Sequence, residues 1–194
     1  MTKIIEEMCN FKETEMHYSA ITNYWFKEID PDKWFVKDKS FDSDLSNKFS
    51  SQVQLALDNK LENWKENEEG YLALILLLDQ FTRNIFRNDP KAFSGDTKAL
   101  NLCFQSILKG MLNNNNPSWR HFFLMPMMHS ENIAIQEMSL PLFEKYTNEK
   151  TLNYAKKHHK IIQRFGRFPH RNKILDRKSS EEEFMFLKEP GSSF

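Results

Sequence analysis

Hydrophobic positions along the chain recur every three to four residues, the period of an α-helix, and residues 71–87 carry this pattern most strongly. The segment opens with an uninterrupted apolar run and then brings in polar side chains without losing the helical spacing: Asp79, Gln80, Arg83, Asn84 and Arg87. Spacings of four residues place these side chains on one broad helix face. A helix that is apolar on every side is normally buried, and a buried charge must be paired. The segment therefore predicts a polar cluster inside a helical domain.

The same period predicts further helices on both sides of this segment. We expect them over residues 16–28, 42–56, 96–109, 126–146, 149–164 and 183–187. Three residues mark expected boundaries: Asp42 as an N-cap, Pro141 as a kink or break within its helix, and Gly166 as a left-handed C-cap. No segment keeps the two-residue alternation of a strand beyond four residues. The predicted fold class is all-α, with seven to eight helices in antiparallel pairs.

The composition fits one folded domain over residues 1–194, with 1–15 and 189–194 loosely ordered at its ends. Hydrophobic residues make up 40% of the chain, which excludes an intrinsically disordered protein. Lys plus Arg and Asp plus Glu number 27 each, so no overall charge attracts nucleic acid or an anionic membrane.

The cysteines and the apolar runs bear on the cellular compartment. Cys9 and Cys103 are far apart and show no paired spacing, which indicates reduced thiols and a cytoplasmic protein. The first residues are partly acidic and contain no long apolar run, so we expect no signal peptide. No apolar run is long enough to cross a bilayer, and we expect no membrane partner.

Two more segments, residues 128–136 and 158–172, carry more polar side chains than their apolar surroundings explain. Arginine matches carboxylate and phosphate groups through its planar set of N–H donors, so the arginines of these segments predict an anionic ligand. A helix that starts near Pro126 would add the positive field of its N-terminus at His129. The predicted ligand-binding residues are Gln80, Arg83, Asn84, Arg87, Glu131, Gln136, Arg164, Arg167, Arg171 and Asn172.

Candidates for proton transfer lie in the same segments. His129 and His170 could act as general acid or base, because an imidazole titrates near neutral pH. Asp79 could orient such a histidine or a water molecule. These three residues are the predicted catalytic group if the chain is an enzyme, which the sequence leaves undecided. No metal-ligand motif such as HExxH is present, so neither a metal nor another cofactor is predicted.

Each of these features also has a structural interpretation. Asp79 and Arg83 could form a buried ion pair that only stabilises the fold, and the histidines could be hydrogen-bonded helix residues. Arginines interleaved with aromatic residues over 164–171 also suit nucleic-acid binding by stacking, which the zero net charge disfavours.

The polar motifs together resemble the hallmark of domain-of-unknown-function family 924. They are residues 77–84 (LLDQFTRN) with Arg87 and Asp96, residues 128–131 (MHSE) and residues 164–172 (RFGRFPHRN). The resemblance covers nearly the whole chain from about residue 20 and implies a tetratricopeptide-like helical bundle or solenoid. The biochemical role of the family is not established. Members usually have proline at the position of Thr82, so we expect a straighter helix here.

Two functional hypotheses follow. In the first, the polar cluster is a pocket for a small anionic molecule, with or without catalysis. In the second, the chain is a tetratricopeptide-like scaffold that binds a peptide and uses the cluster as internal support. The first hypothesis requires Asp79, His129 and His170 to face a common opening. The oligomeric state cannot be predicted from the sequence.

Overall fold

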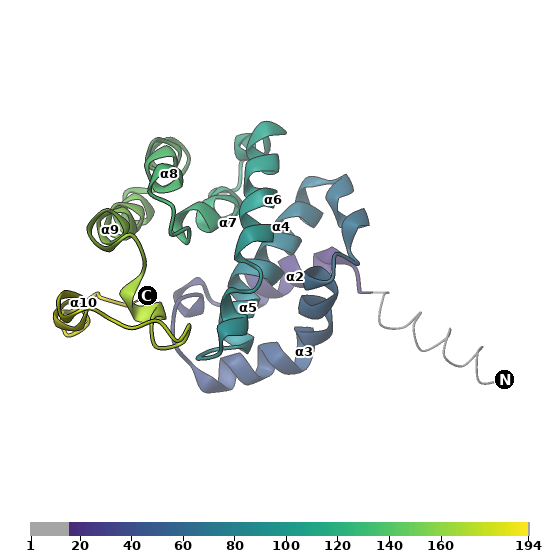
Figure 1. Ribbon diagram of the computed structural model, residues 1–194. Coiled ribbons are helices and arrows are strands. Elements are labelled where there is room, and N and C mark those ends of the chain that lie inside the picture. Colours follow the sequence, from purple (N-terminus) through teal and green to yellow (C-terminus); the bar gives the residue numbers. More distant parts are fainter. Residues whose placement is uncertain (1–15, 194) are drawn as a thin grey trace.

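The computed structural model describes residues 16–193, which fold into helices joined by short connections (Figure 1). The α-helices are α2 (Tyr18–Asn23), α3 (Lys39–Leu57), α4 (Glu68–Ile75), α5 (Thr82–Ile85), α6 (Asp96–Leu108), α7 (Pro117–Met128), α8 (Ile133–Tyr146), α9 (Glu149–Phe165) and α10 (Glu181–Phe186). Two π-helical segments, η1 (Tyr24–Glu28) and η4 (Leu76–Phe81), continue α2 and α4. The short 3₁₀ turns are η2 (Pro31–Lys33), η3 (Glu62–Glu66), η5 (Pro90–Phe93), η6 (Met111–Asn113) and η7 (Pro169–Arg171). No strand occurs in this part of the chain, which confirms the all-α prediction.

The helices form two sides that meet along the middle of the molecule. Figure 1 shows α8, α9 and α10 on one side, α2, α3 and α4 on the other, and α6 between them. Consecutive helices α7, α8 and α9 pack against one another in chain order. The tetratricopeptide-like arrangement stays a prediction. Among residues 16–193, no helix combines the length and the apolar character needed to span a membrane.

The central helix runs without interruption from α4 through η4 into α5. Asn67 caps its start, where the side-chain oxygen accepts a 3.0 Å hydrogen bond from the Gly70 N–H. Every residue from position 70 to position 82 is buried, because α2, α3, α6 and α7 pack around this helix. The prediction of a helix buried on all sides is confirmed.

The π-helical segment η4 changes the register of the polar side chains. The Thr82 N–H donates to the Leu77 carbonyl, five residues back, while the Thr82 hydroxyl donates to the Leu78 carbonyl at 2.8 Å. A π turn contains more residues than an α turn and widens the helix at this point, in place of the expected straighter helix. Asp79 and Arg83 stay in contact at a spacing of four, but Asn84 and Arg87 contact Asp42 of α3 instead, so the prediction that all five polar residues share one face is wrong.

The break between α7 and α8 falls at residues 129–132, and the predicted single helix over 126–146 is wrong. Pro141 lies inside α8, which runs on to Tyr146, and Glu137, one turn earlier, is exposed. Asn132 starts α8 by accepting a 2.9 Å hydrogen bond from the Ala134 N–H. His129 is consequently the C-cap of α7, at the negative end of a helix dipole, not near a helix N-terminus.

The other boundary residues show smaller differences. Asp38, not Asp42, caps α3 through hydrogen bonds from Ser40 and Phe41, so Asp42 lies one turn inside the helix. Helix α10 begins at Glu181, two residues before the predicted start, and Ser180 caps it with a capping box. Gly166 ends α9 at φ 69°, which confirms the predicted left-handed cap.

The predicted loose ordering of the chain ends stays a prediction. Residues 1–15, which include Cys9, lie outside the described residues. Cys103 is a free thiol that is fully buried in the core.

Candidate functional site

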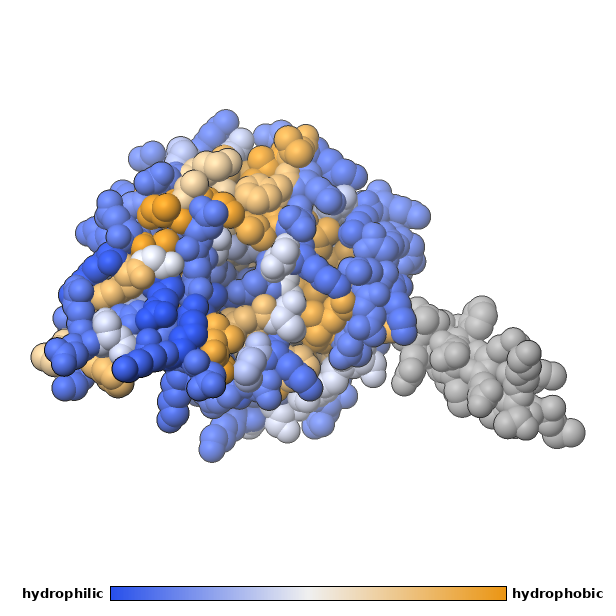
Figure 2. All heavy atoms as spheres, in the orientation of Figure 1, coloured by the Kyte–Doolittle hydropathy of each residue, from blue (hydrophilic) through white to orange (hydrophobic). Residues whose placement is uncertain are grey.

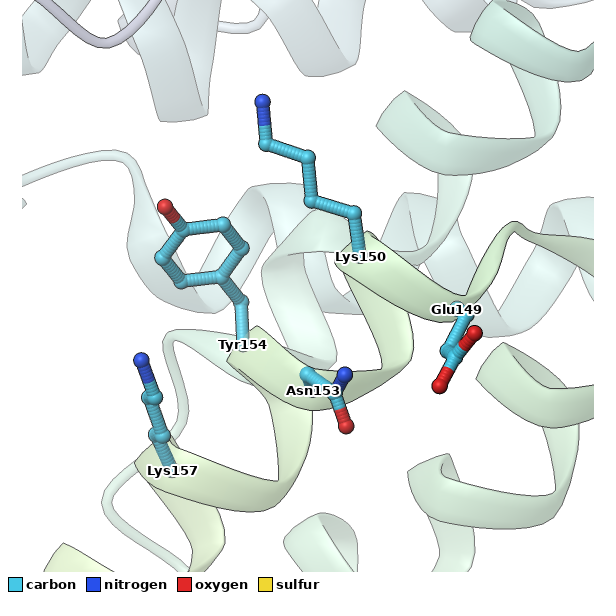
Figure 3. Close-up of a pocket in the computed structure, with 5 residues that line it drawn as sticks. All are labelled: Glu149, Lys150, Asn153, Tyr154 and Lys157. Atoms are coloured by element: carbon cyan, nitrogen blue, oxygen red, sulfur yellow. The ribbon is translucent and has the colours of Figure 1, made fainter.

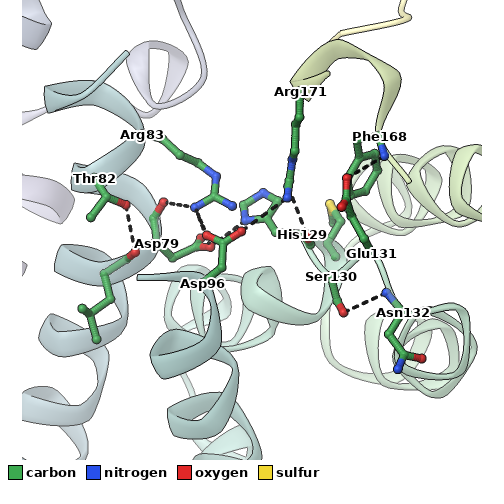
Figure 4. Close-up of polar contacts among 12 residues, drawn as sticks. Asp79, Thr82, Arg83, Asp96, His129, Ser130, Glu131, Asn132, Phe168 and Arg171 are labelled. Atoms are coloured by element: carbon green, nitrogen blue, oxygen red, sulfur yellow. Dashed lines mark hydrogen bonds and ion pairs between the residues drawn. The ribbon is translucent and has the colours of Figure 1, made fainter. Parts of the chain in front are cut away.

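The polar cluster lies where the two sides of the molecule meet, and Asp79 of η4 is its centre (Figure 4). This carboxylate is fully buried. Its Oδ1 lies 2.7 Å from His129 Nδ1 and 3.2 Å from Arg83 Nη1. Its Oδ2 accepts a 2.6 Å hydrogen bond from Gln80 Nε2. Burial alone would raise the pKa of Asp79, but the Arg83 charge and these hydrogen bonds outweigh it and hold the pKa well below its usual range.

Asp96, the first residue of α6, joins two arginines from opposite sides of the site. Its Oδ1 lies 2.9 Å from Arg83 Nη1 and its Oδ2 lies 3.4 Å from Arg171 Nη1. The Arg171 Nη2 also donates a 3.0 Å hydrogen bond to the His129 carbonyl. Figure 4 shows both guanidinium groups pointing toward Asp96. Asp96 was not predicted as a site residue, and its only sequence signal was its place in the family motif.

The His129 ring is held in one orientation and one tautomer. The ionised Asp79 carboxylate can only accept, so His129 Nδ1 carries the proton and Nε2 is the basic nitrogen of the neutral ring. No hydrogen bond among residues 16–193 engages Nε2, and 13% of the side chain is exposed. Burial lowers the pKa of His129, which keeps the imidazole neutral at about pH 7.

Two phenylalanine rings enclose the Arg171 guanidinium. Its central carbon lies 4.7 Å from the Phe93 ring centre and 4.6 Å from the Phe168 ring centre. Burial lowers the pKa of Arg171 to about 10, so the group is still charged at neutral pH. Both rings pack against this guanidinium, whose N–H groups remain available as hydrogen-bond donors.

The loop that carries Arg171 is fastened to the turn between α7 and α8. Glu131 accepts hydrogen bonds from Arg177 Nη1 at 2.7 Å and from the Phe168 N–H at 2.8 Å. Gln136 fixes the turn itself, because its Nε2 donates to the carbonyls of Met128 at 2.7 Å and Ser130 at 2.8 Å. The backbone around His129 is therefore held from both neighbouring segments.

Two guanidinium donors at the centre of the site have no acceptor. Arg83 Nη2 and Arg171 Nε are buried and donate to none of the described residues. A buried N–H without an acceptor costs about 1–3 kcal/mol, so native structures rarely leave one unsatisfied. Asp96 Oδ1, which contacts Arg83, is also buried without a hydrogen-bond partner, so the centre of the cluster leaves two donors and one acceptor unsatisfied.

The structure does not bring all the predicted site residues together. Asn84 and Arg87 bond to Asp42 of α3, with the shorter Arg87 contact at 2.5 Å. The remaining predicted residues have partners near α10: Arg164 with Glu182, Arg167 with Glu183, and Asn172 with Ser179.

His170 lies at the edge of the cluster. Its ring centre is 5.6 Å from that of Phe168, and the charges of Arg171 and Glu131 act on its pKa. The structure therefore places Asp79 and His129 in contact and His170 near them. The face in Figure 2 is hollowed at its centre, between the two sides of the molecule.

Two cavities lie elsewhere in the described part of the chain. One, of about 170 Å³, lies between α3, α4 and α6. The other, of about 370 Å³, is an open depression along α9, where Lys150, Tyr154 and Lys157 extend from the same side of the helix (Figure 3). Neither cavity is lined by Asp79 or His129. No group of three or more metal-binding side chains occurs among residues 16–193.

Acid should destabilise the protein through one buried histidine, His158, and three partly buried ones, His121, His129 and His170. Burial lowers the pKa of His121 to about 4 and those of His158 and His170 to about 3, and it also lowers that of His129. Below about pH 6.5 the unfolded chain binds protons that these folded imidazoles exclude. The contribution of these histidines to the free energy of unfolding is therefore fully present above about pH 6.5 and is lost as the pH falls toward 4. Each histidine lowers the free energy of unfolding by up to about 1.4 kcal/mol per pH unit over this range.

Urea unfolding at a series of pH values measures this dependence. In the His158→Gln variant, the free energy of unfolding should fall less steeply as the pH decreases from about 6 to about 4. The difference in slope should correspond to about one proton fewer taken up on unfolding. A wild-type profile that is flat over this range would show that the histidines are not buried in neutral form.

Comparisons with known proteins identify similar chains but no activity. A family model described as a bacterial protein of unknown function (DUF924) matches residues 21–191. A solved structure of a protein of unknown function from Agrobacterium tumefaciens matches with a TM-score of 0.83 and 37% sequence identity. The match covers 88% of this chain and 96% of that chain. No curated protein matches the sequence.

Proposed function

The chain belongs to the DUF924 family of bacterial proteins of unknown function, and we propose that it binds a small anionic molecule beside His129, whose imidazole exchanges a proton. The observation that carries this proposal is the pair of buried N–H donors, Arg83 Nη2 and Arg171 Nε, which have no acceptor among the described residues. An anionic oxygen is the strongest acceptor for a guanidinium donor.

The Asp79–His129 contact supports a role in proton transfer. A carboxylate that accepts from Nδ1 holds the ring in place and leaves Nε2 as a base, which is the arrangement of many catalytic histidines. Cys103, whose pKa burial raises, cannot supply a thiolate in this region. Proton transfer to a bound molecule or water therefore fits the site better than covalent catalysis by a cysteine.

A second candidate function is the tetratricopeptide-like scaffold that binds a peptide. The observation that favours it is the pairing of every predicted arginine except Arg171 at 3.2 Å or less from a carboxylate oxygen of the protein itself. On this proposal Asp79, Arg83 and Asp96 only stabilise the fold, and the peptide binds on another surface.

Nuclear magnetic resonance can separate the two proposals. Acetate and inorganic phosphate are titrated separately into the protein while the imidazole signals are followed, with the His129→Gln variant used to assign the His129 signal. We expect at least one of these anions to shift the His129 signal. Arg171→Gln should remove that response, because it removes the unsatisfied Nε donor.

The matched control is Arg87→Gln. Arg87 is likewise an arginine paired with an aspartate, but it is only partly buried and its partner is Asp42, outside the cluster. This variant should keep the response. If neither anion moves the His129 signal in the wild-type protein, the ligand proposal fails and the scaffold proposal is preferred.

A further inference from the structure

We infer that the anionic group bound at this site is a monocarboxylate and that its binding transfers one proton from solvent to His129. This inference rests on the proposed function and specifies its ligand class. It depends on three features of the site: its charge balance, the shape of the free donors, and the fixed tautomer of His129.

The charges within the cluster already cancel. The carboxylates of Asp79 and Asp96 face the guanidinium groups of Arg83 and Arg171, and the Glu131 carboxylate is paired with Arg177. The charged and titratable groups that surround His129 are Asp79 from η4, Arg83 from α5, Asp96 from α6, His121 from α7, His158 from α9, and His170 and Arg171 from η7. The histidines among them are neutral at about pH 7, because burial lowers the pKa of each.

An added anion therefore needs a compensating positive charge. A monoanion that binds together with one proton leaves the net charge of the cluster unchanged. A phosphate dianion with one proton would leave an additional negative charge beside two buried carboxylates, which low-polarity surroundings oppose strongly. Phosphate could avoid this additional charge only as its monoanion, the minor form above its second pKa, so the charge balance favours a carboxylate.

The free donors also fit a carboxylate. Phe93 and Phe168 both pack against Arg171, and its buried Nε–H is free to donate to a ligand. Arg83 adds its free Nη2. Two donors match the two oxygens of a planar carboxylate, and the phenylalanine rings offer apolar contact to the carbon chain that it carries.

The proton has a defined destination. Asp79 accepts from His129 Nδ1, which leaves Nε2 to take up a proton without any change in ring orientation. A carboxylate nearby favours the resulting imidazolium. In the complex the ligand stays ionised, the proton comes from solvent, and no covalent bond to the protein forms or breaks.

Isothermal titration calorimetry tests the inference on the full chain. Propanoate and inorganic phosphate are titrated near pH 7.5 in two buffers, Tris and PIPES, which differ in heat of ionisation. We expect propanoate to bind at least tenfold more tightly than phosphate. We also expect the buffer dependence of the heat to report uptake of about one proton per propanoate bound.

His129→Gln is the key variant, because glutamine can still donate a hydrogen bond to Asp79 but cannot take up a proton. It should lose the proton uptake. Arg87→Gln, which alters the separate pair with Asp42, should bind propanoate with the same affinity and the same proton uptake as the wild type.

The possible outcomes separate this inference from the proposed function. Tighter binding of phosphate, or propanoate binding without proton uptake, overturns the inference while leaving an anion site in place. Absence of binding by both probes overturns the inference and the proposed function together.

Discussion

Replacing Asp79 with alanine is expected to lower the free energy of unfolding by about 3–5 kcal/mol and the melting temperature by about 6–20 °C. The carboxylate is fully buried, and Arg83, His129 and Gln80 all use it as a hydrogen-bond or ion-pair partner. Its removal leaves a largely buried guanidinium with one carboxylate partner, Asp96, in place of two. Thermal and urea unfolding of the purified variant measure the loss.

A surface ion pair provides the control for this prediction. Arg164 and Glu182 are also 2.8 Å apart, but their side chains are 46% and 61% exposed. Arg164→Ala should change the free energy of unfolding by no more than about 1 kcal/mol. Similar losses in the two variants would show that burial adds nothing to the Asp79 interactions.

Substituting Gly95 with alanine is expected to cost about 3 kcal/mol and to disturb the site as well. A Cβ atom at this position would lie 2.1 Å from the Leu78 carbonyl oxygen in η4. The backbone at the start of α6 would have to move away, and it would carry the neighbouring Asp96 away from Arg83. Unfolding experiments measure the stability, and a crystal structure of the variant measures the Asp96–Arg83 distance.

Gly110 is the matched glycine for this experiment. Its φ of 74° makes alanine mildly unfavourable there, but the added Cβ would meet only the Asn113 side chain, at 3.4 Å. Gly110→Ala should cost about 1–2 kcal/mol and leave the site intact. If Gly95→Ala keeps Asp96 within 3 Å of Arg83 at no greater cost, the close approach of α6 to η4 does not position the site.

The helices that the sequence predicted correctly are those with a strong local signal. Periodicity and a terminal glycine define α6 and α9, because apolar spacing and the left-handed cap at Gly166 depend only on neighbouring residues. The uninterrupted apolar run similarly indicated the buried central helix. Asp79 was predicted to orient a histidine or a water molecule, and the structure places it in contact with His129.

Other features could not be predicted because their causes lie far away along the chain. Asp96 looks like an ordinary acidic residue in the first turn of a helix, and its partner Arg171 is 75 residues distant. The π turn at Asp79 has no local signature, because it depends on the packing of other helices around η4. Proline did not indicate the helix boundaries near His129. The helix α7 ends at Met128 without a proline there, and α8 continues through Pro141.

The long separations within the cluster bear on how the protein folds. His129 is 50 residues from Asp79 along the chain. The Asp79 carboxylate therefore contacts the His129 imidazole only after a long loop of chain has closed. During synthesis, a chain that has emerged only as far as α6 holds an acidic group in an incomplete core. Docking of α7, which carries His129 at its C-terminal end, therefore completes the partners of Asp79, since Arg83 is already present in the earlier segment.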